Sequence, residues 1–245
     1  MPGDPAFVSV GGLAKHFGGI HAVQDLSFGL DRREIVGLIG PNGSGKTTTI
    51  NMLTGVLRPD DGTIAVEGVD MARAPAHHFA RSGIARTFQV PRLFRRMTVM
   101  ENLMVPALSD PSERHASAAG RAREILAFLR LDHLADEYAR ALSGGQQKLL
   151  ELGRALMLKP RLLLLDEPFA GVHPRLLEQI IDHIRSLNRD GHTIVVVDHN
   201  LEAIQSVVSR TIVMTRGRKI ADGAVAEVLQ DPEVVRAYTG ARTKQ

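Results

Sequence analysis

Residues 40–47 read GPNGSGKT and fit the pattern G-x-x-x-x-G-K-[ST] of a phosphate-binding loop. An apolar run at residues 35–39 precedes the pattern, and helix-compatible residues from Thr48 to Leu57 follow it. A strand, a loop and a helix in this order are the setting in which the pattern binds phosphate. The sequence therefore predicts a phosphate site here rather than a glycine-rich turn before an ordinary helix.

The residue types of the loop suit a nucleotide. Gly43 and Gly45 let the backbone turn so that successive N–H groups point at phosphate oxygens, and the following helix adds the positive end of its dipole. Lys46 supplies a charge for the β- and γ-phosphates, and the Thr47 hydroxyl suits Mg²⁺. The predicted nucleotide-binding residues of this segment are Gly40, Pro41, Asn42, Gly43, Ser44, Gly45, Lys46, Thr47 and Thr48.

Length and composition limit the classes of protein that the chain can belong to. Its 245 residues are enough for one large domain with a sub-lobe, and 44% are apolar. There is no cysteine, which excludes disulfides and thiol catalysis and fits a cytosolic protein. No apolar run approaches the roughly 18 residues of a membrane span, and the N-terminal residues show no secretory signal.

Charge is distributed unevenly along the chain, although the net charge is only +3. Residues 71–100 contain six arginines and no acidic residue. Such a stretch suits nucleic acid, anionic lipid or an acidic protein partner, and a solvated basic face is the alternative. The arginines are Arg73, Arg81, Arg86, Arg92, Arg95 and Arg96.

Periodicity along the chain predicts an α/β fold with a parallel sheet. Short strands are expected within residues 6–35 and at 63–66, 161–166 and 193–197, and a hairpin is expected around Gly217. Residues 98–158 are mostly helical in pattern, with a linker at 109–120, and a further helix is expected at 176–187. The helical middle is interpreted as a lobe inserted into the sheet.

Two more segments carry chemistry. Asp166 and Glu167 follow the apolar run of residues 162–165, and the carboxyl ends of strands are where α/β sheets place ligands. Asp166 can hold Mg²⁺ through water, and Glu167 can activate water for attack on the γ-phosphate, although two acids that cap the next segment are the alternative. LSGGQ, at residues 142–146, precedes a helix that is expected at 147–158, with Ser143 as a good N-cap residue, and it forms a second anion site or only a capped helix.

GPNGSGKT, LSGGQ and LLLLDEP in this order resemble the ATP-binding subunits of ABC transporters over nearly the whole chain. The resemblance implies a P-loop NTPase core at about 1–89 and 155–245, an antiparallel β subdomain and a helical subdomain at about 90–154. It also implies hydrolysis of MgATP sandwiched between two subunits. The expected contacts from the second subunit are Ser143, Gly144, Gly145 and Gln146.

Other positions match the family residue by residue. Gln89 resembles the glutamine that senses the γ-phosphate and Mg²⁺, and His199 resembles the histidine that orients the attacking water. Phe17 resembles the aromatic residue that stacks on adenine, with a core phenylalanine as the alternative. His173 stands where many members have aspartate, which leaves open how this loop pairs across the dimer. The resemblance thus implies catalytic roles for Glu167, His199 and Gln89, and metal contacts from Thr47, Gln89 and Asp166.

Residues 85–103 and the C-terminal segment resemble the G-type ATPases of branched-chain amino acid importers, whereas DEPFAGV and VDHN resemble the ATPase of lipopolysaccharide export. The resemblance implies a peripheral protein at the cytoplasmic membrane face with a second ATPase subunit in a homo- or heterodimer, permease subunits and, indirectly, a solute-binding protein. A soluble ATPase acting on DNA or ribosomes is less favoured, so no nucleic acid is expected. Four apolar residues are expected either to dock a permease or to be lobe core: Leu93, Phe94, Met97 and Val99.

Overall fold

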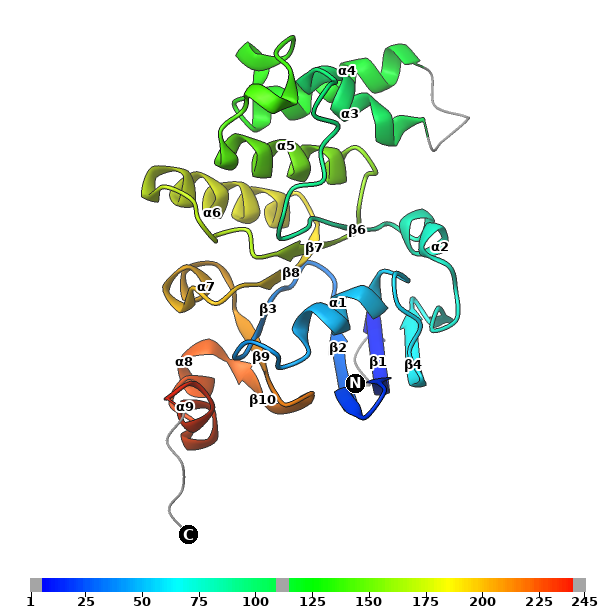
Figure 1. Cartoon of the computed structure of the whole chain (residues 1–245), viewed down its shortest axis with the longest axis vertical. Coiled ribbons are helices and arrows are strands. Elements are labelled where there is room, and N and C mark those ends of the chain that lie inside the picture. The colour runs from blue at the N-terminus through cyan, green and yellow to red at the C-terminus, as the bar shows by residue number, and fades with distance from the viewer. Residues whose placement is uncertain (1–5, 109–114, 240–245) are drawn as a thin grey trace.

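A computed structural model describes residues 6–108 and 115–239 and contains two sheets and a lobe of helices (Figure 1). The smaller sheet is antiparallel and the larger is parallel except where β10 pairs with β9. The smaller sheet has the order β2 (Ile20–Leu30), β1 (Val8–Phe17), β4 (Asp61–Val66) and β5 (Val69–Asp70). The larger has the order β10 (Arg218–Ala224), β9 (Arg210–Thr215), β3 (Ile35–Ile39), β8 (Thr193–Val197), β7 (Leu162–Asp166) and β6 (Ile84–Arg86). The predicted α/β class is confirmed.

The helices divide between the sheets and the lobe. In Figure 1, the lobe lies at one end of the molecule, and α6 lies between α5 and the large sheet. The lobe consists of α3 (Val99–Ala107), α4 (His115–Phe128), α5 (Gly144–Leu156) and two 3₁₀ turns, Asp132–Leu134 and Ala139–Ala141. The other helices are α1 (Lys46–Leu53), α2 (Ala76–Arg81), α6 (Pro174–Arg189), α7 (Leu201–Val207), α8 (Val225–Val228) and α9 (Pro232–Thr239).

The central strands of the large sheet are buried on both faces, which explains their uninterrupted apolar sequences. Along β7, Leu163 and Leu165 belong to the core under the helical lobe, whereas Leu162 and Leu164 face the core shared with α1 and the small sheet. β3 alternates between the same two cores. Because these strands are fixed from both sides, their carboxyl ends are rigid supports for a site.

Several predicted boundaries are corrected. Residues 6–35 form two strands of 10 and 11 residues rather than only short ones, because bulges interrupt the pairing without ending the strands. The helix after the phosphate loop is α1, which ends at Leu53 rather than Leu57. Of the predicted linker at 109–120, residues 109–114 lie outside the described residues, and 115–120 are helical. Strand β8 and the hairpin of β9 and β10 agree with the prediction.

Within the described residues, no helix combines the length and the apolar character needed to span a bilayer.

Candidate nucleotide site

The phosphate loop connects β3 to α1, as predicted. Gly40 and Gly45 have φ angles of 150° and 104°. A Cβ at Gly40 would lie 2.1 Å from the Met214 carbonyl oxygen, and one at Gly45 would lie 2.4 Å from that of Ala22. Both glycines are therefore required by close backbone packing as well as by the turn. Gly43, at φ 77°, has open space where a Cβ would be, so only its conformation favours glycine.

Lys46 lies inside the loop. Its Nζ donates to the carbonyl oxygens of Gly40 and Pro41 at 2.9 and 3.0 Å and to Ser44 Oγ at 3.3 Å. Burial lowers the pKa of Lys46, although the nearby carboxylates of Glu167 and Asp166 act in the opposite direction. The ammonium group is thus positioned among oxygen acceptors at the place where phosphate oxygens are predicted.

A cavity of about 780 Å³ opens over this loop. The predicted residues Phe17, Gln89 and Glu167 line it together with loop residues 42–48. Phe17 is 47% exposed, so it is available for stacking and is not a core residue. The volume is ample for a nucleotide, since ligand sites commonly measure about 300–1,000 Å³.

Other residues around this cavity were missed by the sequence prediction. Arg216 lies in the turn between β9 and β10, and its carbonyl oxygen accepts a hydrogen bond from Gln24 Nε2 at 2.9 Å. The next residue, Gly217, donates its N–H to the Ser44 carbonyl oxygen at 3.0 Å. The turn therefore supports the phosphate loop, and only the fold brings these distant segments together. The missed lining residues are Ile20, His21, Ala22, Gln24 and Arg216.

Asp166 and Glu167 end β7 with different surroundings. Asp166 is buried, and its Oδ2 accepts a hydrogen bond from Arg86 Nη2 at 3.0 Å. Burial raises the pKa of Asp166, while the Arg86 charge opposes that shift. Arg86 also contacts Asn51, so it belongs to the interior and not to the basic surface that the run of six arginines suggests.

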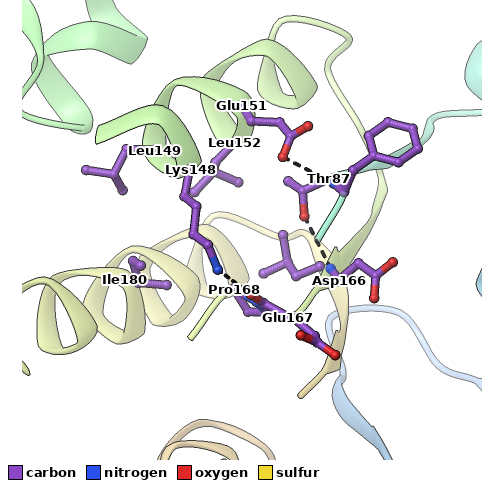
Figure 2. Close-up of a pocket in the computed structure, with 11 residues that line it drawn as sticks. Thr87, Lys148, Leu149, Glu151, Leu152, Asp166, Glu167, Pro168 and Ile180 are labelled. Carbon is purple, nitrogen blue, oxygen red and sulfur yellow. Dashed lines mark hydrogen bonds between the residues drawn. The ribbon is translucent and has the colours of Figure 1, made fainter. Parts of the chain in front are cut away.

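Glu167 has a left-handed backbone, with φ of 50°, a conformation that costs a non-glycine residue on the order of 1 kcal/mol or more. Its N–H donates to the Val197 carbonyl at 2.7 Å, and its own carbonyl oxygen accepts from Lys148 Nζ at 2.6 Å. Its Oε2 accepts from Gln89 Nε2 at 2.8 Å. Figure 2 shows Lys148 pointing from α5 toward the end of β7, whereas the side chains of Asp166 and Glu167 point away from α5.

The space drawn in Figure 2 is not the nucleotide pocket. It measures about 20 Å³ and lies between α5, α6 and the end of β7, where Leu149, Leu152 and Ile180 supply apolar walls. This is about the room of one water molecule. The large cavity over the phosphate loop therefore suits a nucleotide, and the small one is a packing gap behind the end of β7.

Residues 143–146, from the LSGGQ sequence, lie at the start of α5. Ser143 Oγ accepts the N–H of Gln146 at 3.3 Å, and Gln146 Oε1 accepts the N–H of Ser143 at 2.9 Å, which makes a reciprocal capping box. The prediction of Ser143 as N-cap is confirmed, and the helix begins earlier than expected, at Gly144. None of residues 143–146 lines the cavity over the phosphate loop of the same chain.

His199 follows β8 and is separated from that cavity. Its side chain is 61% exposed, and it is not among the lining residues. The buried Asp198 beside it accepts the backbone N–H groups of Phe169, His199 and Asn200 at 2.8–2.9 Å. Asp198 thereby ties the segment after Glu167 to the end of β8, and the predicted role of His199 stays a prediction.

His173 has a local structural role that the sequence comparison left open. It is the N-cap of α6, and its Nδ1 accepts the N–H of Arg175 at 3.4 Å. An aspartate at this position would cap the helix in the same way. The departure from the family pattern therefore leaves the start of α6 intact.

The side chains near the phosphate loop suit Mg²⁺ held with a nucleotide. A threonine hydroxyl, a carboxylate and a glutamine amide are the hard oxygen ligands that Mg²⁺ prefers, and the ion usually keeps waters and substrate phosphates as its other ligands. Among the described residues there is no cluster of three or more histidine or acidic side chains that could hold a metal by itself. Thr47, Asp166 and Gln89 remain the predicted metal contacts.

Comparison with known proteins agrees with this geometry. The ABC transporter family profile matches residues 23–170, and a profile described as branched-chain amino acid ATP-binding cassette transporter matches residues 218–243. A probable branched-chain amino acid transport ATP-binding protein LivG of Archaeoglobus fulgidus is 39% identical, over 95% of each chain. The lipopolysaccharide export ATP-binding protein LptB of Escherichia coli is 38% identical, over 93% of this chain and 95% of its own.

Solved structures show the same fold. The ADP conformation of MJ1267, an ATP-binding cassette of an ABC transporter, is 36% identical, covers 97% of this chain and 100% of its own, and superposes with a TM-score of 0.88. A nucleotide-free ATP-binding cassette from an ABC transporter covers 95% and 98% with a TM-score of 0.87. Fold and site together define a P-loop ATPase. The chain belongs to the ABC transporter family and is one of its ATP-binding subunits.

Proposed function

We propose that the chain is the ATP-hydrolysing subunit of an ABC importer that takes up branched-chain amino acids or a related small polar solute. The observation that carries the proposal is the cavity in which the phosphate loop, Phe17, Gln89 and Glu167 meet. The solute class is supported by the relatives named LivG and by the profile that matches residues 218–243. Export of lipopolysaccharide, the function in the name of LptB, is the alternative.

In this proposal, the nucleotide is MgATP, and each site is completed by a second ATPase subunit. The phosphate loop holds the phosphates, Phe17 stacks on the base, and Asp166 and Thr47 hold Mg²⁺ together with the phosphates. Glu167 would take a proton from the attacking water, His199 would orient that water, and Gln89 would sense the γ-phosphate and Mg²⁺. Ser143 and its neighbours lie outside the cavity of their own chain, which supports their contacting ATP bound by another subunit.

The proposal also assigns the chain to the cytoplasmic face of a membrane, bound to permease subunits. A groove of about 490 Å³ beside the lobe suits such a partner. Its floor and walls combine apolar side chains, among them Leu93, Phe94 and Leu158, with the guanidinium groups of Arg92 and Arg154. An apolar anchor surrounded by charge is the usual centre of a protein interface.

The four residues predicted either to dock or to form core divide between the two roles. Phe94 is 46% exposed and has the Arg154 guanidinium 5.0 Å from its ring centre, so it is available to a partner. Val99 is fully buried in α3 and belongs to the core. Leu93 is partly buried against that core and also lines the groove, whereas Met97 is partly buried and does not line it.

Co-purification with the membrane subunits of the transporter tests this docking surface. The wild-type chain should co-purify with them, and Phe94→Ala should weaken the complex at least about fivefold, which corresponds to about 1 kcal/mol. ATP binding by the isolated variant should be unchanged because Phe94 does not line the nucleotide cavity.

Three outcomes would count against it. A Phe94→Ala variant that melts several degrees lower yet co-purifies normally would make Phe94 a core residue. A wild-type chain that binds no membrane subunit would contradict the transport role. Salt-sensitive DNA binding that is lost when Arg92, Arg95 and Arg96 are removed would favour a nucleic-acid function instead.

A further inference from the structure

Glu151 is a buried acid that the ATPase chemistry described above does not use. It lies two turns into α5 and is 5% exposed. Its Oε1 accepts the backbone N–H of Arg92 at 2.9 Å, and its Oε2 accepts that of Phe88 at 3.2 Å. These two amides lie on either side of Gln89 in the chain. Figure 2 shows the Glu151 side chain pointing from α5 toward the segment that begins at Thr87.

Burying a carboxylate is unfavourable unless it is fully hydrogen-bonded. Burial raises the pKa of Glu151, and the two backbone N–H donors and the Arg154 and Arg86 charges oppose that shift. An apolar residue would fill this position without the desolvation cost. The acid is therefore best explained by what it holds, which is the backbone around Gln89.

The helix that carries Glu151 also contacts the catalytic strand end. Lys148 is one turn earlier on α5, and its Nζ donates to the Glu167 carbonyl oxygen at 2.6 Å. Glu167 Oε2 in turn accepts from Gln89 Nε2 at 2.8 Å. The contacts form a closed ring that runs from α5 through Lys148, Glu167 and Gln89 and returns to α5 through Glu151.

The hydrogen-bond partners of the chain change from the sheet to the lobe between two consecutive residues, Thr87 and Phe88. The Thr87 N–H donates to the Leu164 carbonyl at 2.9 Å, and Thr87 Oγ1 accepts the Asp166 N–H at 3.2 Å, so Thr87 belongs to the sheet. For the backbone groups of Phe88, Arg92 and Phe94 the partners lie on the lobe: Glu151 first, and then Asn102, whose side chain bonds both the N–H and the carbonyl of Phe94 at 2.9 and 3.0 Å. The chain therefore passes from sheet to lobe between Thr87 and Phe88.

We propose that Glu151 is a positioning residue for Gln89: it fixes the backbone around Gln89 to α5, so that Gln89 moves with the helix whose first turn carries Ser143. The inference rests on the proposed function, in which Ser143 contacts ATP bound by a second subunit. Engagement of the α5 N-terminus by that ATP then sets where Gln89 stands relative to Glu167. Glu151 itself does not line the nucleotide cavity.

The test is the ATPase reaction of Glu151→Gln. Glutamine preserves the size of the side chain but replaces one acceptor oxygen with an NH₂ donor, so one of the two amides loses its acceptor. We expect ATP affinity within about threefold of wild type and a kcat lower by about tenfold or more, because Gln89 is displaced and not removed. In a Gln89→Ala background, Glu151→Gln should change kcat by less than about twofold, since coupled residues are not additive.

Leu156→Ala is the matched control for packing on the same helix. Leu156 is buried in α5 without touching the Gln89 segment through a hydrogen bond. It should lower the melting temperature, and any effect on kcat should be the same in the wild-type and Gln89→Ala backgrounds. A factor for Glu151→Gln that is equally large in both backgrounds would overturn the proposal, because Glu151 would then act on kcat independently of Gln89.

Hydrogen–deuterium exchange gives a measurement that needs no variant. In the wild-type protein, the amides of Phe88 and Arg92 should be protected like those within α5, and Glu151→Gln should speed their exchange. Wild-type exchange as fast as in an unprotected loop would overturn the proposal even if the variant does not fold. If Gln89→Ala leaves kcat unchanged, the proposed role of Gln89 is what fails, and Glu151 has no residue to position.

Discussion

Glu167→Gln should bind ATP about as tightly as the wild-type chain and hydrolyse it at least about a hundredfold more slowly. Glutamine has nearly the shape of glutamate but cannot take a proton from water. The left-handed backbone of Glu167, held by the Val197 carbonyl and by Lys148, aims the side chain at the cavity that contains Lys46. The substitution preserves that geometry and removes only the base.

Equilibrium binding of ATP and steady-state release of phosphate, measured on the same preparation, separate the two effects. Asp61→Asn is a suitable control, because Asp61 is an exposed carboxylate on β4 that does not line the cavity. Its turnover should equal that of wild type. Near-normal hydrolysis by Glu167→Gln would exclude Glu167 as the general base.

Lys46→Ala and Ser143→Arg should each abolish ATPase activity, and an equimolar mixture of the two should recover part of it. Lys46→Ala removes the charge beside the phosphates of ATP. Hydrogen bonds from such a charged group contribute about tenfold to a hundredfold to the affinity for ATP. Ser143→Arg places a long side chain at the N-terminus of α5, where the second subunit's ATP is proposed to lie. In a mixed dimer, one of the two sites combines the intact phosphate loop of the Ser143→Arg subunit with the intact Ser143 of the Lys46→Ala subunit.

Random pairing makes half of the dimers mixed, so the recovered rate should be up to about a quarter of the wild-type rate. Ser9→Arg serves as the control, because Ser9 is an exposed serine in β1 and lies outside the cavity. It should be fully active alone. Normal turnover by Ser143→Arg alone would contradict a site shared between subunits.

The parts of the site that follow one another along the chain could be predicted from the sequence. The phosphate loop, the strand that ends at Asp166 and the N-cap Ser143 are each encoded by a local pattern of apolar residues, glycines and capping residues. Strand β8 was predicted with its observed bounds because a run of β-branched residues between turn signals strongly favours a strand over a helix.

The parts that depend on tertiary contacts could not be predicted. Arg86 looked like one of six surface arginines, yet its guanidinium is buried on Asp166, a residue 80 positions away. Arg216, in the turn between two strands of the large sheet, and Gln24, in the small sheet, meet at the nucleotide cavity through a hydrogen bond between segments far apart in the chain, which no local pattern encodes. The capping role of His173 depends on the backbone angle at the start of α6, for which histidine is an uncommon choice.

The sequence patterns of charged and of apolar residues did not distinguish buried from exposed side chains, because burial depends on tertiary packing. Val99 and Phe94 are both large apolar residues in one short segment, but only Val99 faces the lobe core. The exposed Phe94 ring packs instead against Arg154, which lies on α5, far along the chain from Phe94. The groove lined by Phe94, Pro106 and Arg154 therefore forms only when α3 and α5 are brought together.

The central claim is that ATP hydrolysis by this chain drives uptake of a branched-chain amino acid or a related solute. Its most direct test is solute uptake into proteoliposomes that contain the chain together with the membrane subunits of the transporter, with ATP available to the ATPase subunit. We predict ATP-dependent accumulation of radiolabelled leucine, isoleucine or valine in the presence of the solute-binding protein, and its loss with Glu167→Gln. A complex whose ATPase is stimulated by lipopolysaccharide and that accumulates no amino acid would contradict the claim and assign the chain to export.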